Sequence, residues 1–326
     1  KAVADCQKAG IKVVMITGDH PLTAHAIACE LGISNAGKND VLTGLELNRM
    51  TQSELDQKVE DIAVYARVSP EDKLRIVKAW KARGHVVAMT GDGVNDAPAL
   101  RQASIGVAMG KGGTEVARQA ASMILTDDDF ATLSAAVEEG RAVFGNIRRT
   151  VLYLLTGNFT EVLIMLGAVI LGWPPPLMPI HLLWINLVTD GLPSLALAAE
   201  RVSKDVMQTE DRPSPTSFFN RDFYLRIFWI GIIAAAMAIG VYGYSLKTEG
   251  LEIARSEVFT FIVFEELFRS FACRHETRTF FQMGWRSNLL LLFAVVIPIA
   301  FQLVLHHSEL FRDVFQVTPI RWRDCI

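Results

Sequence analysis

The segment from Thr90 to Leu100 carries the side chains best suited to chemistry. It reads Thr90-Gly-Asp-Gly-Val-Asn-Asp-Ala-Pro-Ala-Leu100 and sets Asp92, Asn95 and Asp96 on a glycine-rich turn. Oxygen ligands of this kind are the ones that Mg²⁺ prefers, and the glycines let the backbone approach a phosphoryl group closely. The segment therefore predicts a turn that binds Mg²⁺ beside a phosphoryl group. The alternative is an acidic surface turn.

Two other polar groups could take part in the same chemistry. The triplet Thr17-Gly18-Asp19 ends an apolar run, and Lys73 lies in the first turn of a helix that begins at Ser69-Pro70. A lysine ammonium at a helix start can neutralise the charge that develops on a transferring phosphoryl group. Taken alone, each of these groups would also fit an ordinary turn or a solvated lysine.

The elements that must position these groups alternate between strands and helices. Five short apolar runs are predicted as strands, at residues 11–17, 62–68, 85–90, 105–109 and 121–125. Helical patterns lie between several of them, which predicts a parallel sheet covered on both faces. Ligands bind at the carboxyl ends of strands in such sheets. The two Gly-Asp pairs, Gly18-Asp19 and Gly91-Asp92, both follow predicted strands at that edge.

The second half of the chain has the composition of a membrane protein. Residues 1–140 read as a charged domain, whereas residues 141–326 read as a stalk helix and a helical bundle. Five apolar segments are long enough to be considered as spans of a bilayer, at residues 151–173, 177–199, 225–246, 258–273 and 288–305. We therefore expect a multi-pass membrane protein, although the type of membrane is not indicated.

Polar groups inside these spans predict an ion site, because burying them in a bilayer is costly. The side chains recur at helical spacing on neighbouring spans, and they are Asn158, Glu161, Asn186, Thr189 and Asp190. Two carboxylates with amide and hydroxyl oxygens favour Ca²⁺, which takes six to eight oxygen ligands. Gly191 and Pro193 follow and are expected to unwind the helix. The alternative is a set of polar contacts between helices.

These motifs resemble a known family. The Thr90–Leu100 segment is similar to the hinge motif of P-type ATPases and to the signature of the haloacid-dehalogenase-like fold, and Leu182–Pro193 resembles a span of calcium pumps. The resemblance implies an α/β haloacid-dehalogenase-like (Rossmannoid) phosphorylation domain followed by a transmembrane helical bundle. It also implies an ATP-driven pump that uses Mg²⁺ and ATP and transports Ca²⁺.

The resemblance assigns roles residue by residue. Its catalytic positions fall on Thr17, Gly18, Asp19, Lys73, Asp92, Asn95 and Asp96, with Asp92 on Mg²⁺ and Asp96 as a second candidate ligand. Arg67 and Lys73 are carried over as cofactor-binding residues. The ion ligands carry over to the five polar residues of the first two spans, and Glu266 in the fourth span is a further candidate. Arg269, one turn from Glu266, departs from the pattern and puts a second calcium site in doubt.

One departure concerns the nucleophile. The family phosphorylates the Asp of an Asp-Lys-Thr-Gly-Thr segment, and that segment does not occur here. The expected partners are therefore the lipid bilayer and the rest of a pump, with its actuator domain, nucleotide-binding domain and first four spans. On its own, the chain is expected to be inactive.

Other readings remain open. The same architecture could move Na⁺, K⁺ or H⁺, or the chain could be a membrane-anchored phosphatase-like or non-catalytic module. The net charge of −3 implies no nucleic-acid partner, and the four cysteines have no paired spacing that would indicate a metal or disulfide framework.

Overall fold

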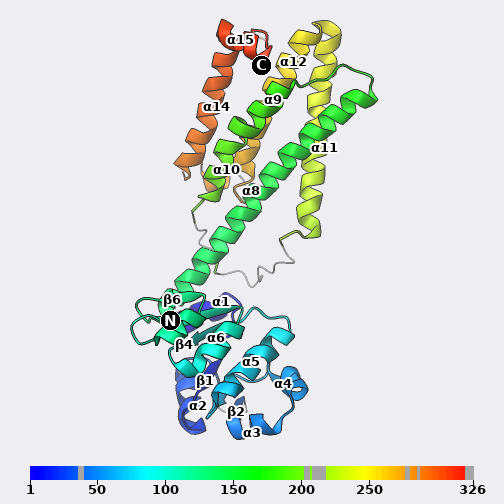
Figure 1. Cartoon of the computed structure of the whole chain (residues 1–326). Coiled ribbons are helices and arrows are strands. Elements are labelled where there is room, and N and C mark those ends of the chain that lie inside the picture. Colours follow the sequence, from blue (N-terminus) through cyan, green and yellow to red (C-terminus); the bar gives the residue numbers. More distant parts are fainter. Residues whose placement is uncertain (36–39, 202–205, 208–217, 276–279, 285–286, 320–326) are drawn as a thin grey trace. The chain divides into compact units, whose positions relative to one another are not determined.

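The computed structural model divides the chain into two compact units (Figure 1). It describes residues 1–35, 40–201, 206–207, 218–275, 280–284 and 287–319. The first unit is essentially Lys1–Gly140, and the second begins at Arg141. Each unit is treated by itself below.

The first unit contains six short strands. They are β1 (Met15–Thr17), β2 (Val41–Thr43), β3 (Val64–Ala66), β4 (Ala88–Gly91), β5 (Ile105–Met109) and β6 (Met123–Leu125). All described pairings are parallel, as predicted, but the strands form two sheets with orders β1-β3-β2 and β4-β5-β6. The prediction of one sheet was therefore wrong for the described residues. It also lacked β2, because Val41–Thr43 does not lie in a longer apolar run of the kind that marks β1, β3 and β6.

Short helices cover these strands. They are α1 (Ala2–Lys8), α2 (Pro21–Glu30), α3 (Gly44–Arg49), α4 (Gln52–Lys58), α5 (Pro70–Ala82), the 3₁₀ turn η1 (Val94–Asp96), α6 (Ala97–Gln102) and α7 (Glu115–Ala120). The helix start predicted at Ser69 is confirmed. The Ser69 hydroxyl accepts the Asp72 amide at 3.2 Å, and the Asp72 carboxylate accepts the Ser69 amide at 2.8 Å. This reciprocal capping, with Pro70 as the first helical residue, fixes where α5 begins.

The two sheets share apolar neighbours. Ile16 of β1 and Val87, just before β4, each pack against two hydrophobic clusters, one built around Tyr65 and the other around Met89. The strands β1 and β4 thus adjoin a common core. This packing places the residues after each strand on the same compact unit.

The second unit is helical. Its elements are α8 (Phe130–Ile170), which starts in the first unit, α9 (Pro179–Trp184), the π-helical turn η2 (Ile185–Thr189), α10 (Gly191–Ala198), α11 (Arg221–Thr248), α12 (Leu251–Ala272), α13 (Phe280–Met283), α14 (Leu289–His307) and α15 (Glu309–Phe315). Four segments are long and apolar enough to cross a membrane: α8, α9 through α10, α11 and α14. Figure 1 shows α8 as one continuous helix.

The predicted fourth span corresponds to α12, which begins seven residues earlier than the apolar pattern indicated. Its 22 residues measure about 33 Å at 1.5 Å per residue. Charged side chains along it, including Glu265, Glu266 and Arg269, keep it out of the set selected by composition. Its apolar residues nevertheless belong to the core of the second unit, with Phe259 and Val263 fully buried.

The interruption predicted near Gly191 takes a different form. The helix does not unwind. It widens into the π-helical turn Ile185–Thr189, in which the Asp190 amide donates to the Ile185 carbonyl at 2.8 Å. A π turn holds one extra residue without losing its backbone hydrogen bonds. Because Pro193 has no N–H, it cannot donate to the carbonyl of Thr189 four residues earlier.

Candidate functional site

The first candidate site is the turn Gly91–Asp96, called the phosphate-side turn here, and Asp96 holds it together. One carboxylate oxygen of Asp96 lies 2.6 Å from the Lys73 ammonium, and the other accepts the backbone amides of Asp92 and Gly93 at 3.3 Å each. Asp96 is buried, whereas Lys73 is about a fifth exposed. A side chain at Gly91 would place its Cβ only 2.6 Å from the Cβ of Asp96. Gly91 is therefore required for the turn to close around this carboxylate.

This geometry separates the roles of the acidic residues on the turn. The oxygens of Asp96 are already engaged with Lys73 and the two amides, while the side chains of Asp92 and Asn95 are exposed on the same turn. Asp92 is thus the carboxylate left for a metal ion, and Asn95 offers an amide oxygen nearby in the sequence. The donor set fits Mg²⁺, which is usually held by one or two carboxylates and keeps several waters.

The Thr17-Gly18-Asp19 turn lies beside the end of β3. The Thr17 hydroxyl donates to Asp19 at 2.9 Å and accepts the Asp19 amide at 3.1 Å. The Asp19 carbonyl accepts the Arg67 amide at 3.2 Å. Arg67 is exposed and has a positive φ of 51°, which is uncommon for a residue other than glycine. Thr17, Gly18, Asp19 and Arg67 are thus brought together at one strand edge.

Asp128 is a site residue that the sequence did not indicate. Its carboxylate accepts the backbone amides of Gly110, Lys111 and Gly112 at 2.6, 3.0 and 2.7 Å. The hydrogen bond from Gly112 lowers the pKa of Asp128, together with those from Lys111 and Gly110 and against the opposing effect of burial. These hydrogen bonds fix the turn of residues 110–112, which leads to Thr114. The Thr114 amide donates to the Asp92 carbonyl at 2.8 Å. Asp128 therefore supports the backbone at Asp92.

We expect Asp128→Asn to raise several-fold the Mg²⁺ concentration needed for half-maximal phosphorylation of the full-length protein. The reason is that an amide NH₂ would face backbone donors that now meet a carboxylate oxygen. A Mg²⁺ titration of phosphorylation from labelled ATP measures the effect. Asp127→Asn is the matched control, since Asp127 accepts from Thr132 and Asp129 rather than from this turn. Equal Mg²⁺ dependence in the two variants would contradict the role of Asp128.

The ion-site candidate begins with α8 and the π turn. The Asn186 amide lies 3.4 and 3.3 Å from the two carboxylate oxygens of Glu161 and donates to the Leu182 carbonyl at 2.9 Å. Glu161 is buried, whereas Asn186 and Asn158 are exposed in the described chain. Glu161 and Asn186 are thus brought together, and Asn158 lies one helical turn before Glu161 on α8.

A second group converges on Gly157 of α8. A Cβ at Gly157 would lie 2.9 Å from a Glu266 oxygen, 3.0 Å from an Arg269 nitrogen and 3.3 Å from an Asp190 oxygen. Glycine thus leaves the space in which these groups meet. Arg269 lies 3.5 Å from Glu266 and 3.2 Å from Glu265. The structure therefore places Asp190 and Glu266 together, with the guanidinium beside them.

Several buried oxygens of this cluster have no hydrogen-bond partner among the described residues. They are the Thr189 hydroxyl, one carboxylate oxygen of Asp190 and both carboxylate oxygens of Glu266. Most buried polar atoms in proteins have a partner, so each exception requires an explanation. Oxygens gathered from the η2–α10 segment and from α12, without hydrogen-bond partners among the described residues, are suited to a hard cation.

Tyr153 of α8 contacts two members of this cluster. Its hydroxyl donates to the Thr189 carbonyl at 3.3 Å, the carbonyl that Pro193 leaves without an amide. The Arg269 guanidinium lies 5.5 Å from the centre of the Tyr153 ring. Neither Tyr153 nor Gly157 stood out in the sequence, because an aromatic residue and a glycine are ordinary in an apolar helix. The spacing of Gly157 and Tyr153 from Glu161, four and eight residues, was the available signal.

Comparison with known proteins matches both halves of the chain. Residues 174–326 match the family of the cation transporting ATPase C-terminus, and residues 1–104 and 74–135 match two families of haloacid dehalogenase-like hydrolases. Together these matches cover the first unit, apart from its last residues, and most of the helical unit.

Individual relatives agree with the family matches. The chain is 44% identical to a calcium-transporting ATPase of Bacillus subtilis over 99% of its length and 36% of that protein. It is 43% identical to a probable cation-transporting ATPase F of Mycobacterium tuberculosis over 98% of the chain and 36% of that protein. It is 39% identical to a calcium-transporting ATPase of Yarrowia lipolytica over 100% of the chain and 35% of that protein.

The chain therefore spans about a third of the length of these relatives. The phosphate-side turn, the helical unit with four apolar helices and the two kinds of family match lead to one conclusion. The chain belongs to the P-type family of cation-transporting ATPases.

Proposed function

We propose that this chain forms part of an ATP-driven pump that transports Ca²⁺ through an aspartyl-phosphate intermediate. The observation that carries the proposal is the set of buried oxygens on Thr189, Asp190 and Glu266 without hydrogen-bond donors among the described residues. Glu161 and Asn186 add a carboxylate and an amide. The names of the relatives in Bacillus and Yarrowia support Ca²⁺ as the transported ion.

The phosphate-side turn would serve the phosphorylation step. Asp92 would hold Mg²⁺, with Asn95 on the same turn, and the ion would supply positive charge to the phosphoryl oxygens. Lys73, held by Asp96 at 2.6 Å, would bring a second positive charge to the same place. The backbone amide of Gly18 would donate a hydrogen bond to a phosphoryl oxygen. The Thr17 hydroxyl, whose one hydrogen is now donated to Asp19, would donate to a second phosphoryl oxygen after turning away from that carboxylate. Arg67 would contact the nucleotide.

The phosphorylated aspartate would come from a part of the pump outside these residues. Among the described strands, β1 pairs only with β3 and β4 only with β5, so each has one edge without a strand partner. Both strands end at the candidate catalytic turns. A strand added along these edges would present its last residue beside Thr17 and Asp92. The pump's remaining domains and spans, together with the lipid bilayer, are the partners that this function requires.

Arg269 sets the charge available for the ion. Its guanidinium lies 3.5 Å from Glu266 and 3.2 Å from Glu265, whereas Glu161 and Asp190 have no ion pair among the described residues. A bound Ca²⁺ would therefore be balanced mainly by Glu161 and Asp190. The two carboxylates match the charge of one Ca²⁺, so we propose one ion per transport cycle.

We expect Arg269→Asn to increase the number of Ca²⁺ ions bound per molecule, because it frees one carboxylate charge that the guanidinium now balances. Equilibrium binding of ⁴⁵Ca²⁺ to the full-length protein measures this number. Arg269→Lys keeps the charge and should keep the wild-type value. Arg255→Asn, on the same helix but bonded to the Pro175 carbonyl, is the control for a lost arginine. An unchanged number in Arg269→Asn would contradict the assignment.

Binding and ATP hydrolysis by the wild-type protein test the choice of ion. Hydrolysis that rises with micromolar Ca²⁺, together with saturable ⁴⁵Ca²⁺ binding, is expected. If Na⁺, K⁺ or a change in pH activates hydrolysis and Ca²⁺ does not, the pump carries another cation. Absence of ATP hydrolysis under all of these conditions would favour a module without pump activity.

A further inference from the structure

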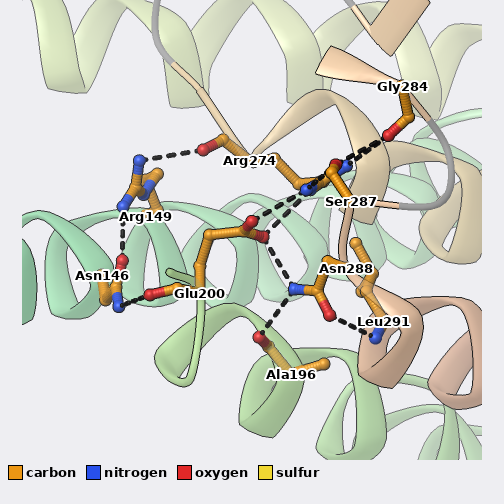
Figure 2. Close-up of polar contacts among 9 residues, drawn as sticks. All are labelled: Asn146, Arg149, Ala196, Glu200, Arg274, Gly284, Ser287, Asn288 and Leu291. Atoms are coloured by element: carbon orange, nitrogen blue, oxygen red, sulfur yellow. Dashed lines mark hydrogen bonds and ion pairs between the residues drawn. The ribbon is translucent and has the colours of Figure 1, made fainter. Parts of the chain in front are cut away.

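The end of α10 is tied down by side chains from two other helices. The Asn146 amide of α8 donates to the carbonyls of Ala198 and Glu200 at 3.1 and 2.7 Å. The Asn288 amide, at the start of α14, donates to the Ala196 carbonyl at 3.3 Å. The last carbonyls of a helix have no partner within it, so outside donors must supply one. Figure 2 shows the contacts of Asn146 with the Glu200 carbonyl and of Asn288 with the Ala196 carbonyl.

The carboxylate of Glu200 joins this end to the segment that follows α12. Arg274 approaches it in a two-pronged contact, with Nε 2.9 Å from one oxygen and Nη2 2.8 Å from the other, and Asn288 adds a bond of 2.7 Å. The Arg274 side chain is 1% exposed and that of Glu200 is 7% exposed. Burial raises the pKa of Glu200, but the hydrogen bonds from Arg274 and Asn288 outweigh it and the net pKa is lowered.

The remaining donors of Arg274 are used within the same cluster. Its Nη2 donates to the Ser287 hydroxyl at 2.7 Å, and its Nη1 lies 3.3 Å from the Gly284 carbonyl. The Arg274 carbonyl in turn accepts Arg149 of α8 at 2.9 Å, and Arg149 also contacts the Asn146 side chain oxygen. Figure 2 shows this network joining α8, the end of α10 and the start of α14. We call these residues (Asn146, Arg149, Glu200, Arg274 and Asn288) the Glu200 cluster.

The Glu200 cluster lies at a fixed distance along the helices from the ion-site candidates. On α8, Asn146 precedes Asn158 by 12 residues, which is about 18 Å of helix, and Glu200 follows Asp190 by 10 residues, about 15 Å. A short connection reverses the chain after α8, so α8 and the α9–α10 segment run in opposite directions. The similar distances mean that the cluster anchors both ligand-bearing segments at one end.

A register role explains this cluster better than a contribution to stability. Buried ion pairs often contribute little net stability, since desolvation offsets their attraction, and their best-attested use is to fix register. Here α10 has only eight residues and follows a π turn, so its position is not set by a continuous α-helical ladder. The end of α10 away from the π turn is held by the Glu200 cluster.

We propose that Glu200, Arg274 and Asn146 are positioning residues that set the register of α10 against α8 and thereby the spacing of Asp190 from Glu161. The proposal rests on the proposed function, since its consequence is the affinity for Ca²⁺. None of the three residues is placed among the ion ligands.

The test compares single and double substitutions in the full-length protein by ⁴⁵Ca²⁺ binding and thermal unfolding. Glu200→Gln leaves the buried Arg274 charge unpaired and should weaken Ca²⁺ binding about tenfold, in the range of couplings carried by such networks. The double variant Glu200→Gln, Arg274→Gln removes both charges and allows an amide pair, so it should recover most of the affinity. Asn146→Ala leaves no buried unpaired charge on Glu200 or Arg274, and should weaken binding several-fold.

Glu309→Gln is the matched control, because Glu309 forms an exposed pair with Arg312 in the same unit. The proposal is overturned if Asn146→Ala and the double variant both fold and Asn146→Ala binds Ca²⁺ like the wild type. It is also overturned if Glu200→Gln folds and lowers only the unfolding temperature. Wild-type protein that binds no Ca²⁺ would instead defeat the proposed function.

Discussion

Replacing Asp190 with asparagine is expected to lower the affinity for Ca²⁺ at least about 30-fold, because removing one buried charge from a charge–charge contact costs roughly 2–5 kcal/mol. Asp190 is 2% exposed, and one of its carboxylate oxygens has no donor among the described residues. Asparagine keeps the size of the side chain but removes the charge and replaces one oxygen with a donor group. Equilibrium ⁴⁵Ca²⁺ binding to the full-length protein gives the affinity.

Two further variants make this result specific. Glu161→Gln should act in the same direction, since Glu161 is the other carboxylate without an ion pair among the described residues. Asp222→Asn removes an aspartate charge from the exposed first turn of α11, which carries none of the candidate ligands, and should leave Ca²⁺ binding unchanged. Wild-type Ca²⁺ affinity in Asp190→Asn would show that the transported ion or its site has been misassigned.

A second large effect is expected at the phosphate-side turn. Asp92→Asn should slow phosphorylation from ATP roughly 100-fold or more, because losing a hard metal ligand beside the phosphoryl group removes several kcal/mol of charge stabilisation. The turn itself should remain folded, since it is closed by Asp96 and Gly91 rather than by the Asp92 side chain. Acid-stable incorporation of label from γ-labelled ATP into the full-length protein measures the rate.

The neighbouring acids separate a metal role from a structural role. Asp96→Asn should lower thermal stability as well as phosphorylation, because it disturbs the contact with Lys73 and the two backbone amides. Asp61→Asn, an exposed carboxylate of the same unit, should change neither. If raising the Mg²⁺ concentration has no effect on Asp92→Asn while phosphorylation remains at the wild-type rate, Asp92 does not hold the metal.

Local patterns predicted much of the fold. The cap at Ser69 and the apolar helices depend on neighbours within a few residues, and each is present in the structure. The early start of α12 was missed because Glu252, Arg255 and Glu257 interrupt the apolar run. Ala254 and Val258 of this helix lie in the core, so only one of its faces is buried. Composition alone does not distinguish such a half-buried helix from a charged loop.

The contacts across the chain could not be predicted. Asp96 meets Lys73 from 23 residues away, and Glu200 meets Arg274 from 74 residues away. Charged residues near predicted loops usually face solvent, so nothing in the sequence distinguishes the buried pair. The candidate ligands could nevertheless be proposed from the sequence, because their helical spacing is local even though their meeting in space depends on the tertiary fold.

The π turn before Asp190 has a consequence for how the candidate ligands can respond to binding. Each residue of an α-helix advances the side-chain direction by about 100°. If the extra residue of the π turn is passed to a neighbouring turn, Thr189 and Asp190 swivel by that angle while α9 and α10 keep their own hydrogen bonds. Such a shift needs no melting of the span and no loop within the bilayer. Ile185–Thr189 is therefore the part of this span at which a small backbone exchange would reorient two oxygen-bearing side chains at once.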